Sequence, residues 1–282
     1  MASEIRIDAL LPSEMAKRAE YTGVRKAEAP LLTTFTLAIL AGAFIALGAV
    51  FATTVAAETS GMWPYGFTKL LIGLAFCLGL VLVIVGGAEL FTGNNLIVMA
   101  WASGKISMKA LLRNWGIVYL GNFVGSFGTA ILVFLSKQHT FGGGSIGETA
   151  IQIANSKVGL GFFQAIMLGI LCNILVCLAV WLTFSARTTV DKIIAILFPI
   201  SAFVAAGFEH SVANMYFIPL GLLIKMFDST FVANTGIAVN NLTWGSFFIQ
   251  NLLPVTIGNI IGGSVFVAAV YWSVFLRRVE EA

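Results

Sequence analysis

Three ionisable side chains lie deep inside long apolar stretches of the sequence: Glu89, Glu209 and His210. On insertion scales an ionisable residue at the centre of a bilayer costs roughly 2.5 to 3.5 kcal/mol, so such residues are functional candidates. His210 is distinctive because an imidazole exchanges its proton near neutral pH. It is a candidate for contact with a substrate that itself titrates. The structural alternative is a neutral ring that bonds a free backbone carbonyl.

Thr92 follows Glu89 by three residues. Its hydroxyl can donate to a carboxylate or accept from an imidazole, so it is a candidate partner for His210, and it can equally cap a following helix. We expect Glu89 and Glu209 to be structural, accepting hydrogen bonds from backbone N–H groups where a helix is interrupted.

The elements that carry these residues are membrane spans. Hydrophobic residues make up 59% of the 282 residues and charged residues only 10%, against about 25% charged in an average soluble domain. Apolar windows predict six crossings. Their approximate ranges are 33–56, 67–102, 114–135, 160–185, 192–226 and 250–276.

Lysine and arginine indicate the orientation of these spans. Twelve of the 16 cations fall in the N-terminal arm, the second and fourth loops and the C-terminal tail, whereas only Lys69, Lys137, Lys157 and Lys225 fall on the other side. The positive-inside rule therefore predicts that both termini are cytoplasmic. The cations cluster at membrane edges, so the net charge of +3 does not indicate a nucleic-acid partner.

The second and fifth spans are too long to be single straight helices. About 35 residues of helix would measure about 50 Å, well beyond a hydrocarbon core of about 30 Å. Each contains a glycine-bearing string, at 86–95 and at 206–215, and the two strings share the pattern Gly-x-Glu-x-x-x-(Gly/Ala)-Asn. The third and sixth spans also match, since Gly121-Asn122-Phe123-Val124-Gly125 resembles Gly258-Asn259-Ile260-Ile261-Gly262. The second and fifth spans are therefore both predicted to be broken helices.

The chain is therefore expected to be a duplicated three-helix unit. Three crossings is an odd number, so the second copy is inverted relative to the first. Interrupted helices at matching positions indicate a substrate site near the midplane, where free N–H groups suit an anion. The expected organisation is an amphipathic cytoplasmic arm (1–32), a first repeat (33–135), a periplasmic linker (136–159), a second repeat (160–276) and a cytoplasmic tail (277–282).

With these features, the sequence resembles the formate/nitrite transporter family, in particular its formate-channel branch. The resemblance covers nearly the whole chain. It is carried by the strings at 88–92 (AELFT), 207–215 (GFEHSVANM) and 254–259 (PVTIGN), and the branch is indicated by 10–17 (LLPSEMAK) and 218–221 (IPLG).

The resemblance implies an all-α, aquaporin-like protomer of six transmembrane helices in a homopentamer, with one pore per protomer, in a bacterial inner membrane. It implies a passive, pH-gated channel for formate and similar small monovalent anions, with the N-terminal arm involved in gating. It also implies pore roles for particular residues. The polar pore residues would be His210, Thr92, Asn173 and Asn214, the basic entrance residues Lys26 and Lys157, and the apolar constrictions Leu80, Leu90, Phe76, Phe203 and Val176.

Several alternatives stay open from the residues alone. One alternative is that the transported anion is nitrite or hydrosulfide instead of formate. Another is that the protein is a proton-coupled formate/H⁺ transporter. His210 either relays a proton to the anion or remains neutral as a hydrogen-bond donor. An aquaporin-type channel for neutral solutes lacks support because no Asn-Pro-Ala string occurs at either break. Enzymatic motifs and metal-ligand clusters are likewise missing, so we expect no enzyme activity, cofactor or metal.

Overall fold

The computed structural model describes residues 9–59 and 62–277, and this part of the chain contains helices but no strand. The membrane helices are α2 (Leu31–Ala56), α3 (Tyr65–Gly86), α5 (Met108–Leu135), α7 (Phe162–Thr183), α8 (Thr189–Ala205), α9 (Ser211–Phe227) and a continuous stretch of α11 (Leu253–Ile261), α12 (Val270–Phe275) and two π-helical segments, η4 (Ser246–Leu252) and η5 (Gly262–Ala269). The shorter elements are α1 (Pro12–Glu28), η1 (Gly93–Ile97), α4 (Val98–Ala102), η2 (Gln138–Thr140), η3 (Gly142–Gly144), α6 (Ser145–Val158) and α10 (Ser229–Thr235).

Five of these helical stretches are long and apolar enough to cross a bilayer: α2, α3, α5, α7 and Ser246–Phe275. The remaining crossing is divided between α8 and α9, which have 17 residues each. The prediction of an all-α protein with six crossings is therefore confirmed, and the chain is a multi-pass membrane protein.

Both predicted breaks are present, and glycine begins each one. Gly87 directly follows α3 with φ +73°, and Gly207 follows α8 with φ +74°. This left-handed backbone conformation is accessible to glycine at little cost, so the helix ends there. After the glycine the chain runs without helix to Thr92 in the first break and to His210 in the second.

The repeated glycines of the third and sixth spans allow close helix contacts. A Cβ atom on Gly125 of α5 would collide with the Ile39 carbonyl of α2, and one on Gly262 would collide with the Ile170 carbonyl of α7. The contact of α2 with α5 and the contact of α7 with the start of η5 are therefore equivalent in the two repeats.

The repeat extends further than the sequence indicated, because the segment expected to be a linker contains the helix α6. The buried residues Ala16, Ala19, Gly23 and Ala27 of α1 lie 131 positions before Gly147, Ala150, Ala154 and Val158, which are the matching buried residues of α6. Each half of the chain thus begins with a short amphipathic helix that packs through small side chains.

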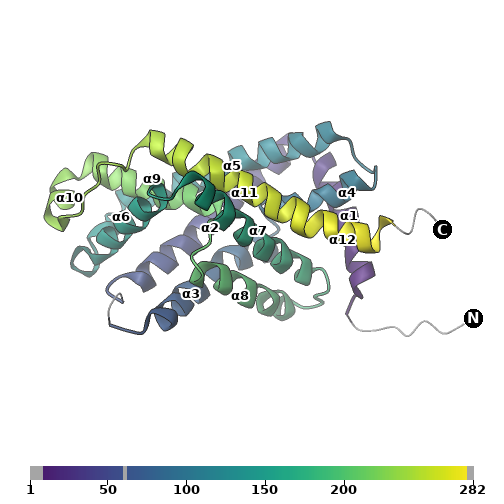
Figure 1. Ribbon diagram of the computed structural model, residues 1–282, viewed down its shortest axis with the longest axis horizontal. Helices are drawn as coiled ribbons and strands as arrows, with labels where there is room; N and C mark the ends of the chain where they lie inside the picture. The colour runs from purple at the N-terminus through teal and green to yellow at the C-terminus, as the bar shows by residue number, and fades with distance from the viewer. Residues whose placement is uncertain (1–8, 60–61, 278–282) are drawn as a thin grey trace, which may run out of the picture.

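The two amphipathic helices occupy opposite ends of the molecule. Figure 1 shows α1 beside α4 and α12 at one end, and α6 beside α10 at the other. This arrangement follows from the inversion of the second repeat, and it places α1 and α12 at the same end of the molecule.

Asp228 joins α9 to α10, where the chain bends by 104°. Its carboxylate accepts from His139 Nε2 at 3.1 Å and from the Phe231 N–H at 3.2 Å. The His139 hydrogen bond, followed by the Phe231 bond, lowers the pKa of Asp228 below its ordinary value. A lowered carboxyl pKa stabilises the fold above the ordinary pKa of about 3.9, and this contribution disappears as the pH falls through the lowered pKa.

We therefore expect Asp228→Asn to lower the thermal midpoint in detergent at pH 5, and the difference from wild type to shrink progressively once the pH falls below the ordinary carboxyl pKa of about 3.9. Midpoints measured in steps between pH 5 and pH 3 check this. A difference that stays constant down to pH 3 would show that the charge of Asp228 contributes nothing.

Candidate functional site

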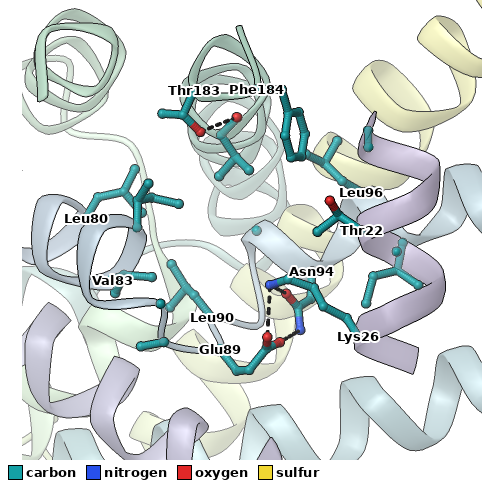
Figure 2. A pocket seen from close by; sticks show the side chains of 18 of the residues that line it. Thr22, Lys26, Leu80, Val83, Glu89, Leu90, Asn94, Leu96, Thr183 and Phe184 are labelled. Carbon is teal, nitrogen blue, oxygen red and sulfur yellow. Dashed lines mark hydrogen bonds and ion pairs between the residues drawn. The ribbon is translucent and has the colours of Figure 1, made fainter. Parts of the chain in front are cut away.

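Two cavities of similar size approach the breaks from opposite ends. The α1 cavity, about 260 Å³, is lined by residues of α1, α3, α7, α8 and the first break, including Lys26, Leu80, Glu89, Leu90 and Asn94. The α6 cavity, about 270 Å³, is lined by residues of α2, α3, α6, α8, α9 and the second break, including Phe76, Lys157, Phe203, Glu209 and His210. Figure 2 shows the α1 cavity.

A lysine and a glutamate form an ion pair at the base of each cavity. In the α1 cavity, the Lys26 ammonium lies 3.2 Å from Glu89, and Asn94 donates to the same carboxylate at 2.7 Å (Figure 2). In the α6 cavity, Lys157 lies 2.8 Å from Glu209, and Asn214 donates at 2.7 Å.

An asparagine of the following span completes each of these networks. Asn94 donates to Asn114, whose own amide donates to the Lys26 carbonyl at 3.0 Å. In the second repeat, Asn214 donates to Asn251, which donates to the Lys157 carbonyl at 2.9 Å. Sequence analysis did not identify Asn114 and Asn251, although both are asparagines within apolar spans.

The role expected for the glutamates needs correction. Their carboxylates bond lysine and asparagine side chains, whereas the backbone groups at the breaks are bonded by Asn122 and Asn259. Asn122 accepts from the Phe91 N–H at 2.9 Å and donates to the carbonyl of Glu89 at 2.9 Å. Asn259 accepts from the Ser211 N–H at 2.9 Å and donates to the carbonyl of Glu209 at 2.9 Å. A neutral amide has both a donor and an acceptor for backbone groups, which a carboxylate lacks.

His210 and Thr92 connect the two breaks. His210 Nε2 lies 2.9 Å from Thr92 Oγ1, so the pairing considered from the sequence is present. Both side chains are almost fully buried, and the ring is turned into the protein interior rather than towards lipid. His210 also begins α9, where its Nδ1 accepts from the Ala213 N–H at 3.1 Å.

The second contact fixes the tautomer of the neutral ring. Because a backbone N–H can only donate, Nδ1 of His210 must be unprotonated, and the hydrogen of the neutral imidazole lies on Nε2. Nε2 therefore donates to the Thr92 oxygen. Among the described residues the Thr92 hydroxyl forms a hydrogen bond only with His210, so its own hydrogen remains free for another acceptor.

Apolar side chains close the space between the cavities. Leu80 and Leu90 line the α1 cavity, whereas Phe76 and Phe203 line the α6 cavity. Phe203 stacks on the His210 ring with centroids 5.9 Å apart, and Phe76 meets Phe203 edge to face at 5.7 Å. Leu80 and Phe76 are four residues apart on α3, so one face of this helix borders both cavities.

Three of the residues expected in the pore, Thr92, Asn173 and Val176, are not among the residues that line either cavity. Val176 is buried in the apolar core. Asn173 is fully buried, and its amide donates to the carbonyls of Thr92 at 3.3 Å and Asn259 at 2.7 Å. In the structure Asn173 therefore holds the Thr92 backbone in place.

A corresponding bond runs in the other direction. The Ser126 hydroxyl of the first repeat lies 3.0 Å from the Gly42 carbonyl of its own repeat and 3.3 Å from the Val212 carbonyl of the second, and its single hydrogen is shared between them. Val212 matches Thr92 in the alignment of the two breaks. Each repeat thus holds the break of the other, which fixes the spacing between Thr92 and His210.

This geometry suits a small anion. Each cavity presents cations, and the hydroxyl of Thr92 and the N-terminal end of α9 supply partial positive charge between them. The polar groups at this point are enclosed by apolar side chains, so the arrangement selects for size as well as charge.

Comparisons with known proteins agree with this interpretation. A family model described as formate/nitrite transporter matches residues 13–273. The formate channel FocA of Escherichia coli (strain K12) is 46% identical over 285 residues, covering 100% of both chains. FocA of Haemophilus influenzae (strain ATCC 51907 / DSM 11121 / KW20 / Rd) is 42% identical and covers 91% of this chain and 92% of its own. A solved structure described as a pentameric formate channel with formate bound has a TM-score of 0.82 and 47% identity, covering 88% of this chain and 98% of that one.

Proposed function

The chain belongs to the formate/nitrite transporter family, and we propose that it is a passive, pH-gated channel for formate and similar small monovalent anions. The observation that carries the proposal is the hydrogen bond between His210 and Thr92, which lies between two cation-bearing cavities. The similarity to formate channels over the full length supports formate as the substrate. The proposal is for a transport protein and not an enzyme.

The assembly and orientation are part of this proposal. The protein forms a homopentamer in a bacterial inner membrane, with one pore per protomer, in keeping with the pentameric structure it resembles. Both termini are cytoplasmic, which the distribution of lysine and arginine supports. The α1 cavity is then the cytoplasmic entrance and the α6 cavity the periplasmic one, with the N-terminal arm as the gating element.

The energetic problem for the channel is dehydration of the anion. Moving a bare charge into an apolar ring costs tens of kcal/mol in the ideal limit, which proteins reduce by supplying hydrogen bonds. We propose that the anion first enters one of the two cavities and reaches the ion pair of Lys26 or Lys157 there. The Leu80, Leu90, Phe76 and Phe203 side chains then rotate aside, and the Thr92 hydroxyl donates to the anion at the midpoint. Asn214 contributes by holding Glu209 in the α6 cavity.

We propose further that His210 stays neutral while the anion passes. Protonating a carboxylate of pKa about 4 at pH 7 costs roughly 4 kcal/mol, which a proton relay must supply. A relay also requires a hydrogen on Nδ1, where the Ala213 N–H already points, and this would break the cap of α9. The hydrogen bonds of His210 therefore favour anion passage over a proton-coupled formate/H⁺ transporter.

Nitrite and hydrosulfide remain the alternative substrates within this proposal, since both are small monovalent anions. Uptake of labelled formate and of nitrite into proteoliposomes, corrected for empty liposomes and measured across external pH, tests the choice. We expect saturable formate uptake well above the lipid background. Uptake of nitrite alone would contradict the proposal.

A further inference from the structure

The lysine at the base of each cavity is already paired, so it is not the main source of attraction for an incoming anion. Lys26 is neutralised by Glu89 and Lys157 by Glu209. Two further cations, Arg18 of α1 and Lys192 of α8, line the α1 cavity, and Glu89 is the one carboxylate among its lining residues. The α1 cavity therefore has two positive charges that are not balanced within it.

These two cations depart from the symmetry of the repeats. Lys192 lies 120 positions after Ile72, the offset that relates the two breaks, and Ile72 lines the α6 cavity. Arg18 corresponds, at the offset that relates α1 to α6, to Thr149, which is not among the residues of the α6 cavity. The residues that occur in both repeats, such as Glu89 and Glu209, form the networks at the breaks. Arg18 and Lys192 have no charged counterpart in the other repeat, so the fold does not require them.

The surroundings of Arg18 and Lys192 leave the positive charge of both side chains available to an anion in the α1 cavity. Arg18 donates to the Phe184 carbonyl at 3.0 Å, a neutral partner, and in the view of Figure 2 Phe184 lies across the cavity from Glu89. The neighbour of Lys192, Asp191, accepts from the Arg187 and Thr188 N–H groups at the start of α8 and does not line the cavity. In the α6 cavity the one further cation is Lys69, whose ammonium lies 5.5 Å from the Tyr65 ring centroid.

We propose that Arg18 and Lys192, the outer cation pair, form a binding station for small carboxylate anions in the α1 cavity, ahead of the Lys26–Glu89 ion pair. The station rests on the proposed channel function. It concentrates the anion at one mouth of the pore, as clefts lined by charge of one sign do. At about 7 Å in water, each charge multiplies the local anion concentration about three-fold, and dissolved salt screens this effect.

The test uses proteoliposomes containing the full-length protein, with sub-saturating formate and potassium chloride, whose anion is not a carboxylate, to set the ionic strength. The double variant Arg18→Gln/Lys192→Gln is expected to reduce the initial formate flux about five- to ten-fold at an ionic strength of about 10 mM. At about 0.5 M the flux should come within two-fold of wild type, because the charges are then screened. The reduction should be equal for influx and efflux, since a passive pore at zero voltage has one permeability.

Two controls separate charge from structure. The variant Lys105→Gln/Lys109→Gln removes the same charge from the loop before α5 and the start of α5, outside the cavity, and should retain the flux and its salt dependence. The variant Arg18→Lys/Lys192→Arg keeps the charge and should also retain both. Two results would overturn the proposal that the outer cation pair binds the anion. One is a charge-conserving variant that transports formate as slowly as the glutamine variant. The other is a glutamine variant whose flux and salt dependence equal those of wild type. Failure of the channel function itself is distinguishable, because wild-type protein would then transport no formate at any salt concentration.

Discussion

Replacing Thr92 by Val is expected to reduce formate flux about ten- to hundred-fold while the protein still folds. The substitution is nearly isosteric but removes the hydroxyl that is free to donate to the anion, and a hydrogen bond to a charged group contributes roughly 1.5 to 3 kcal/mol. Folding should survive because the equivalent position of the second break is already a valine, Val212. Initial rates of formate uptake into proteoliposomes measure the effect.

The matched control is Thr92→Ser, which keeps the hydroxyl and loses only a methyl group. It should retain most of the wild-type flux. If Thr92→Val conducted formate as fast as Thr92→Ser, the hydroxyl would have no part in passage of the anion.

Replacing Glu209 by Gln is expected to destabilise the protein by about 3 to 5 kcal/mol, because it leaves Lys157 as an unpaired charge in a largely buried site. The Lys157 side chain is only 14% exposed and that of Glu209 6%. The carboxylate also accepts from Asn214 and Asn251, and an uncharged amide serves these donors less well. Thermal unfolding in detergent should show a midpoint lowered by roughly 10 °C.

The symmetry of the repeats supplies the control, Glu89→Gln. Its partner Lys26 is 29% exposed, so water can solvate the lysine once the carboxylate is gone. We expect a clearly smaller loss of stability for Glu89→Gln. Equal losses in the two variants would contradict the view that burial of the lysine sets the cost.

The sequence predicted the spans and the breaks because both depend on local composition. Runs of apolar residues define a crossing, and glycines such as Gly87 and Gly207 end a helix wherever a left-handed residue is required. The match around Asn122 and Asn259 revealed the duplication, since a glycine–asparagine string within a membrane span is unusual enough to recognise twice.

The partners of the site residues were not predictable in the same way. The equivalence of α1 and α6 rests on small buried residues such as Gly23 and Ala154, which carry little signal in a chain with 29 glycines. The bonds from Asn173 to Thr92 and from Ser126 to Val212 join opposite repeats, and their geometry depends on how the two halves pack. Sequence indicated which polar residues lie in the membrane, but only the packing shows which of them line a cavity.

The most direct test of the account is whether formate crosses as an anion past a neutral His210. Proteoliposomes with equal K⁺ concentrations inside and outside are given an inward formate gradient at pH 7.5, with and without valinomycin, so that K⁺ can enter with the anion. The luminal pH is recorded, and the uptake of empty liposomes is subtracted. The account predicts that valinomycin accelerates formate uptake several-fold, because K⁺ movement compensates the charge of the anion, and that no matching proton enters. Uptake that is indifferent to valinomycin and brings in one proton per formate would contradict it.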